Sequence, residues 1–176
     1  HVDQAIREYQ FAVRFNPGFA RAHYNLAVAS WQKGLRSMAV REAELARELG
    51  YEAAGPLLKN LGVSASRDKP ARKAPRRKIA EPTLSPAVRK RLDQGLGYLK
   101  REEWKKASDV YEELIAGNHD LVEAEIGLAR AYAGDLRWDD AAAVLSPLLE
   151  RHPDYGAAHC LLGQSLAARD QLNEAI

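Results

Sequence analysis

Alanine recurs along this chain at a fixed interval. Ala107, Ala141 and Ala175 are evenly spaced, and Ala5 and Ala39 are separated by the same interval. A constant period of about 34 residues, as here, is typical of a helical repeat array, in which each repeat is a small helical unit. One such unit cannot bury its apolar face alone, so neighbouring units must stack against one another. The period therefore predicts an all-α fold built by stacking.

Other residues keep the same phase as the alanines. Trp104 and Trp138 are also one period apart, and each precedes its alanine by one helical turn. Leucine, small, aromatic and proline residues recur at characteristic places in the repeats, namely Leu26, Ala27, Gly95, Tyr98, Tyr111, Leu128, Ala129, Tyr132, Pro17 and Pro153. With these residues the chain resembles the tetratricopeptide repeat family over all but its middle. The resemblance implies a right-handed α-solenoid of helix-turn-helix repeats, each with a helix A and a helix B.

Helical periodicity and turn residues divide the chain into elements. Ser85 followed by Pro86 is a favourable start for a helix, with a capping side chain and a proline in the first turn. Pro147 lies inside a predicted helix, where we expect a bend. The other predicted helices cover residues 2–15, 20–33, 37–49, 56–61, 103–116, 121–133, 138–151, 155–168 and 172 onward.

The stretch 64–86 differs from the rest in composition. It holds four of the eight prolines and seven basic residues against two acidic ones, so it buries too little to fold alone. We predict a basic, proline-rich linker at 64–85. It separates a first block at 1–63 (a helix B, one full repeat and a short helix) from a second at 86–176 (two full repeats and a truncated third). A decayed repeat is the alternative, because Ala39 and Ala107 are two periods apart.

Neither end of the chain has the polar face of a capping element. The chain begins in a helix B at Val2 and stops at Ile176, just inside another predicted helix B. We therefore expect a part of a longer protein, with self-association through the uncapped ends.

Composition and motifs exclude several classes of function. The formal charge of +2 does not by itself indicate a nucleic-acid partner. The single cysteine, Cys160, cannot form an internal disulfide, which favours the cytoplasm over the periplasm. Abundant Ala and Arg suggest a bacterial gene. No metal-ligand spacing, phosphate loop or catalytic motif occurs, so we predict no enzyme, no cofactor and no metal. His23 and His159 share a repeat position that is usually aromatic, which indicates a packing role.

In the family that the chain resembles, the inner faces of helices A line a concave groove. The resemblance therefore implies a scaffold or adaptor that binds a peptide or protein segment there. The alternative is the non-catalytic arm of a larger enzyme, such as a glycosyltransferase or sulfotransferase. The positions predicted to line the groove are Arg21, Tyr24, Asn25, Val28, Lys59, Arg89, Asp93, Lys100, Glu123, Arg130 and Gln164.

A subset of this family clamps the carboxylates of chaperone C-termini with Lys, Arg and Asn side chains from three consecutive helices A. Asn25 matches the Asn position, and Lys59 lies where a basic residue is expected. Gly55 stands where Lys is expected, and the second block has Asp93 and Gly127 in the phase of Asn25. The match to the clamp is therefore partial.

The basic residues of the linker are Arg72, Lys73, Arg76, Arg77 and Lys78. A solvated spacer is the simplest interpretation. A strip that contacts nucleic acid or an anionic membrane is one alternative, and such contacts weaken with salt. Packing against the repeats, which are net acidic, is another. No aromatic residue interrupts the run, so stacking on bases is unsupported.

Overall fold

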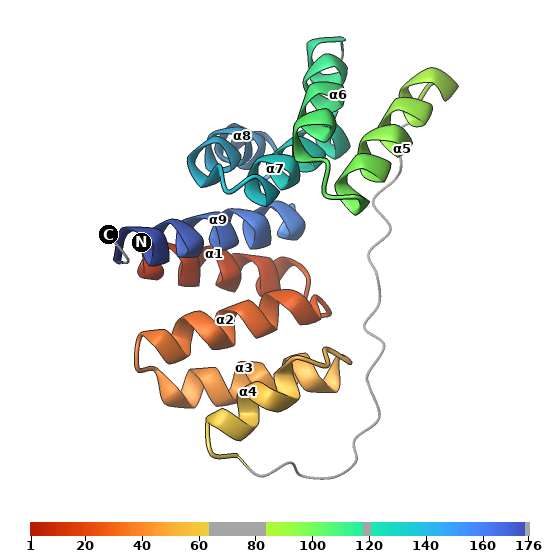
Figure 1. Ribbon diagram of the computed structural model, residues 1–176. Helices are drawn as coiled ribbons and strands as arrows, with labels where there is room; N and C mark the ends of the chain where they lie inside the picture. Colours follow the sequence, from red (N-terminus) through yellow and green to blue (C-terminus); the bar gives the residue numbers. More distant parts are fainter. Residues whose placement is uncertain (64–83, 118–120, 175–176) are drawn as a thin grey trace. The chain divides into compact units, whose positions relative to one another are not determined.

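The computed structural model describes the backbone of residues 1–63, 84–117 and 121–174, and the side chains of these ranges up to residue 169. Within these ranges the chain forms nine α-helices and no strand (Figure 1). The helices fall into two compact units, one of α1–α4 with α9 and one of α5–α8. The predicted all-α fold is confirmed. None of the described helices is long and apolar enough to cross a membrane.

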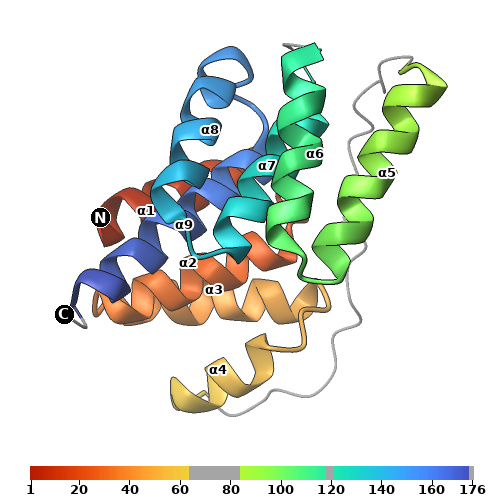
Figure 2. The same ribbon diagram turned by 45° about the horizontal axis from the view of Figure 1, so that its top comes forward.

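The first unit is held together by small residues and leucines. Ala27, Ala39 and Ala43 are fully buried, which lets α2 and α3 approach closely. The short helix α4 packs on α3 (Figure 2), where Leu58 and Leu61 are buried in the same cluster. The helices of this unit are α1 (Val2–Phe15), α2 (Ala20–Gln32), α3 (Arg36–Glu48), α4 (Ala54–Asn60) and α9 (Gly156–Glu174).

In the second unit, two helix pairs pack around the side chain of Tyr111. Ser85 caps the first helix, since its Oγ accepts a hydrogen bond from the Val88 backbone N–H at 3.3 Å. The buried Tyr111 ring lies so close to Gly95 and Gly127 that a Cβ built on either would fall 2.6 and 2.3 Å from ring carbons. Only glycine permits this approach. The helices of this unit are α5 (Pro86–Lys100), α6 (Trp104–Gly117), α7 (Val122–Gly134) and α8 (Trp138–Arg151).

In each of three helix pairs, the turn from helix A to helix B contains one residue with a left-handed backbone conformation. Gly34 has φ of 76°, and the equivalent residues Glu102 and Leu136 have φ of 58° and 60°. Glu102 and Leu136 are one repeat period apart, and Gly34 is two periods before Glu102. Glycine adopts this conformation freely, whereas it costs a residue with a side chain about 1–2 kcal/mol.

The C-terminal helix differs from the sequence prediction. A turn was expected between residues 168 and 172, but α9 runs without interruption from Gly156 to Glu174. Asp170 occupies the repeat position where Gly34 turns, and neither glycine nor proline stands nearby to end the helix. Ala175, the last alanine of the periodic series, lies outside the described residues. Pro147 does not break α8, which continues to Arg151.

The grouping of α9 also differs from the predicted second block at 86–176. In the structure α9 lies beside α1 (Figure 1) and belongs to the first unit as far as Asp170. The physical reason is that α1 has the phase of a helix B and α9 that of a helix A, so the two faces are complementary.

Candidate functional site on the helix A faces of α2 and α9

The pairing of α9 with α1 reproduces the contact between two helices of one repeat. Tyr9 packs on Gly163, where a built Cβ would fall 2.6 Å from the ring. Tyr111 packs on Gly95 with the same separation. Gly163 lies two repeat periods after Gly95, and Tyr9 lies three periods before Tyr111. We call the packing interface between the helix A and the helix B of one repeat a joint. The joint between α9 and α1 is therefore equivalent to the joint between α5 and α6.

A histidine–glutamate pair repeats with the same geometry in two joints. In α2 and α3, Nδ1 of His23 lies 2.7 Å from Oε2 of Glu42. In α9 and α1, Nδ1 of His159 lies 2.6 Å from Oε2 of Glu8. Glu8 and Glu42 are one repeat period apart, and the histidines are four periods apart. Both histidines are buried, so the predicted packing role is correct but incomplete.

Further hydrogen bonds surround the His23 pair. The other ring nitrogen, Nε2, lies 3.0 Å from the Pro17 carbonyl oxygen, so both ring nitrogens of His23 lie within hydrogen-bond distance of an oxygen atom. Burial alone would raise the pKa of Glu42. The hydrogen bonds from His23 and Arg41 outweigh it and hold the pKa of Glu42 below its ordinary value.

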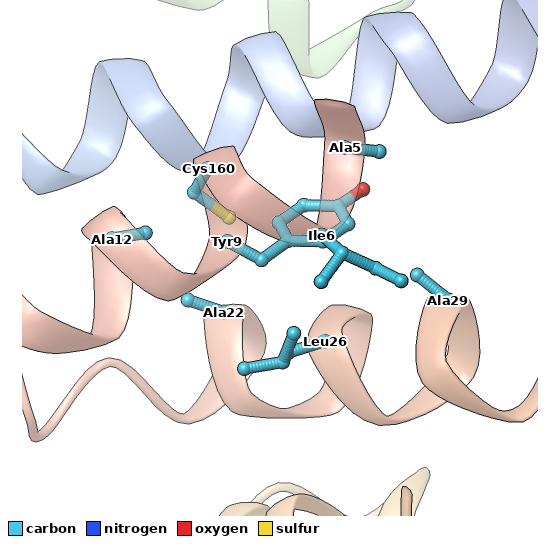
Figure 3. Close-up of a cluster of buried hydrophobic side chains, with 8 residues drawn as sticks. All are labelled: Ala5, Ile6, Tyr9, Ala12, Ala22, Leu26, Ala29 and Cys160. Atoms are coloured by element: carbon cyan, nitrogen blue, oxygen red, sulfur yellow. The ribbon is translucent and has the colours of Figure 1, made fainter. Parts of the chain in front are cut away.

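The core under this surface is formed by α1, α2 and α9 together. Figure 3 shows the Tyr9 ring between these helices, near Cys160 and Leu26. Tyr9 is 3% exposed. Burial raises the pKa of Tyr9, and the nearby Cys160 raises it further, so the phenol stays neutral. This apolar floor fixes the relative positions of α2 and α9.

Three of the predicted groove residues meet above this core. In the amide orientation that satisfies both ends of Gln164, its Oε1 accepts hydrogen bonds from Arg21 Nη2 at 2.9 Å and Arg21 Nε at 3.0 Å. The same oxygen accepts from Asn25 Nδ2 at 2.8 Å; the orientation is assigned from these donors. Asn25 Nδ2 also faces the Cys160 Sγ at 3.7 Å. We call Arg21, Asn25, Gln164 and Cys160 the polar cluster.

The remaining predicted residues of the first unit lie on α2 and α4. The Tyr24 ring packs against the Tyr51 ring in a tilted arrangement, with centroids 4.9 Å apart, which connects α2 to the turn before α4. Val28 is half-buried and Lys59 is exposed. Lys59 therefore adds a second positive charge to the helix A faces of this unit.

The predicted residues of the second unit are all exposed. They are Arg89, Asp93 and Lys100 on α5, and Glu123 and Arg130 on α7. No hydrogen bond or ion pair joins them to one another within the described ranges. The structure thus brings together three predicted residues in the first unit and leaves these five as separate solvated charges.

Sequence reasoning missed the acidic partners of the two histidines. Glu8 and Glu42 were visible as a pair of glutamates one period apart, but their role required knowing that helix B faces the histidine position. The five basic linker residues, Arg72 to Lys78, lie outside the described residues. No cluster of three or more metal-ligating side chains occurs in the part of the chain that the structure describes.

The helix pairs, their common period and the close contacts between helix A and helix B define a helical repeat scaffold. A family model described as TPR repeat matches residues 2–34, and one described as Tetratricopeptide repeat matches residues 126–176. No curated protein and no solved structure matches the chain. The chain therefore contains tetratricopeptide repeats in both of these regions, and the predicted solenoid fold class is confirmed. Repeats of this family generally act in protein–protein interaction.

Proposed function

We propose that the chain is a scaffold that binds an extended segment of a partner protein along the helix A faces of α2 and α9. The observation that carries the proposal is the polar cluster, in which side chains from two helices far apart in the sequence converge. The polar cluster forms only when α2 and α9 lie side by side. Helix α1 packs beneath both helices and holds them in this position.

The chemistry of the polar cluster favours an oxygen acceptor on the ligand. Arg21 has five N–H donors and Asn25 has two, while Gln164 Oε1 accepts three hydrogen bonds from them. The other donors are available to a backbone carbonyl or a carboxylate. Arg21 and Lys59 are both positive, so an acidic segment suits this face better than a basic one.

Peptide binding measured by fluorescence anisotropy tests the proposal. The probe is a library of labelled extended peptides in which each acidic member has a matched amide member. We expect the acidic peptides to bind and Arg21→Ala to weaken them about tenfold or more, since a hydrogen bond to a charged group contributes roughly 1.5–3 kcal/mol.

Arg7→Ala is the matched control, because Arg7 is exposed on α1 and lies outside the polar cluster. It should leave the affinity unchanged. Equal losses in Arg21→Ala and Arg7→Ala would mean that only net charge matters. Unchanged binding in Arg21→Ala would remove the polar cluster from the site.

A further inference from the structure

Leu136, in the turn between α7 and α8, combines an unfavourable backbone conformation with an unfavourable environment. It is 70% exposed, whereas the other exposed Leu, Phe and Trp residues of the described ranges are 36–42% exposed. Its φ of 60° is left-handed, which destabilises a residue that has a side chain. An apolar side chain that remains in water adds little stabilisation by burial. Within the chain, nothing therefore offsets the strain at Leu136.

The two equivalent turns contain residues that suit the left-handed position better. Gly34 adopts this conformation freely, and Glu102 has an exposed, charged side chain that water solvates well. Leu136 has neither property. Backbone strain and broken local rules persist mainly at positions that have a function. The combination of strain and exposure at Leu136 indicates a contact with a molecule outside the chain.

Two tryptophan rings border this turn. Trp138 follows Leu136 by two residues and begins α8. The Trp104 ring packs on Gly134, where a built Cβ would fall 2.5 Å from a ring carbon. Both tryptophans are half-buried, so each leaves part of its apolar surface to solvent. We call Trp104, Leu136 and Trp138 the turn patch.

Carboxylates predominate among the charged groups around the turn patch. Residues 135–140 contain three aspartates against one arginine. The charge of Arg137 is engaged within the turn, because its Nε donates a hydrogen bond to Asp140 Oδ2 at 2.7 Å. On α6, the Lys105 ammonium is likewise paired with Asp109, at 2.8 Å. The rim of the turn patch is therefore acidic. It repels the phosphates of nucleic acids and anionic lipids, and it attracts lysine and arginine side chains.

We propose that the turn patch binds a partner protein whose apolar surface is flanked by lysine or arginine side chains, with Leu136 as the central anchor. Burial of the leucine side chain supplies the hydrophobic part of the affinity. The acidic rim speeds association with a basic partner and discriminates against an acidic one. The turn patch belongs to the second unit and the polar cluster to the first, so this proposal does not rest on the proposed function.

Amphipathic helical peptides are defined probes of this chemistry. One labelled peptide has leucine on one face and lysine on the other. A second replaces every lysine by glutamate, and a third replaces every leucine by serine. Binding to the full chain is measured by fluorescence anisotropy. We expect the leucine–lysine peptide to bind more tightly than either of the others. Equal binding of the leucine–glutamate peptide, or no binding of the leucine–lysine peptide, would overturn the proposal.

Substitution of single leucines locates the contact. Leu136→Ala removes the anchor and should weaken the leucine–lysine peptide about tenfold or more. Leu96→Ala is the matched control of identical composition, because Leu96 is 40% exposed on α5 and lies outside the turn patch. Leu136→Met keeps a large apolar side chain and should retain the affinity. Equal affinities of Leu136→Ala and Leu96→Ala would overturn the proposal.

Leu136→Gly separates binding from stability. It should weaken the peptide as Leu136→Ala does, yet its Tm should not fall, because glycine adopts the left-handed conformation freely. A loss of binding without a loss of stability is the result that a merely structural role of Leu136 would not give. Binding of Leu136→Gly as tight as that of wild type would overturn the proposal.

Discussion

Gly95 and Gly97 provide a matched pair of substitutions in one helix. Both lie in α5, and replacing either by alanine makes proteins of identical composition. Alanine favours a helix over glycine by about 0.8–1.0 kcal/mol per residue. At Gly97 a new Cβ would meet only the Arg101 Nη1, at 3.6 Å, so Gly97→Ala should stabilise the unit by close to this amount.

Gly95→Ala should have the opposite sign. Its Cβ would fall 2.6, 2.8 and 3.0 Å from three carbons of the Tyr111 ring. The ring has little room to move, because Gly127 on α7 also lies against it, with a built Cβ 2.3 Å from the nearest ring carbon. Overpacking of this kind costs roughly 1–3 kcal/mol, which equals or exceeds the helix-propensity gain. The two variants should therefore differ in free energy of unfolding by about 1–3 kcal/mol.

Thermal unfolding followed by circular dichroism measures this difference. For a unit of 60–100 residues, 1 kcal/mol corresponds to a shift of about 4–8 °C in Tm. Gly95→Ala should melt at least about 4 °C below Gly97→Ala, and the double variant Gly95→Ala with Tyr111→Phe should remain low, because the clash involves ring carbons. Equal Tm values for the two glycine variants would refute the close approach.

Two further predictions concern backbone strain and pH. Leu136→Gly should raise the stability by up to about 1 kcal/mol, because it removes left-handed strain of roughly 1–2 kcal/mol and loses part of this gain to unfolded-state entropy; Leu136→Ala, which keeps the strain, should not raise the Tm. Glu42→Gln should lower the stability at pH 7, and the difference from wild type should vanish in acid. The folded-state pKa of Glu42 lies below the ordinary value of 4.5, so its contribution is present above that pH and is lost as the pH falls through the lowered pKa. Urea unfolding at a series of pH values checks this, and a constant difference across the series would contradict it.

The helices were predictable because their apolar residues recur at a helical spacing and their turns contain glycine or proline. Both signals are local. The predicted bounds of α1 and α8 agree with the structure to the residue. The predicted turn after residue 168 was wrong because it rested on repeat phase alone. No residue near Asp170 stops a helix, and local propensity prevailed.

The polar cluster was predictable only in part. Repeat phase placed Arg21, Asn25 and Gln164 on helix A faces, which is a property of each helix alone. Their meeting depends on α9 lying beside α1 and α2, and sequence order predicts a different partner for α9. Such long-range pairing is decided by complementary surfaces rather than by local pattern. If the contact between His23 and Glu42 had been known, the repeat period would have predicted the contact between His159 and Glu8.

A double-mutant cycle on Glu8 and His159 tests most directly whether α9 and α1 form one repeat. The free energy of unfolding is measured for wild type, Glu8→Ala, His159→Ala and the double variant in dilute solution, with the same cycle on His23 and Glu42 as the reference. Pairs in contact show coupling of about 0.5–3 kcal/mol. The structure predicts coupling in this range for both cycles, and additive effects for the non-contacting pair of Glu8 and His23. Additive effects for Glu8 and His159 beside clear coupling in the reference cycle would contradict the joint on which the proposed site depends.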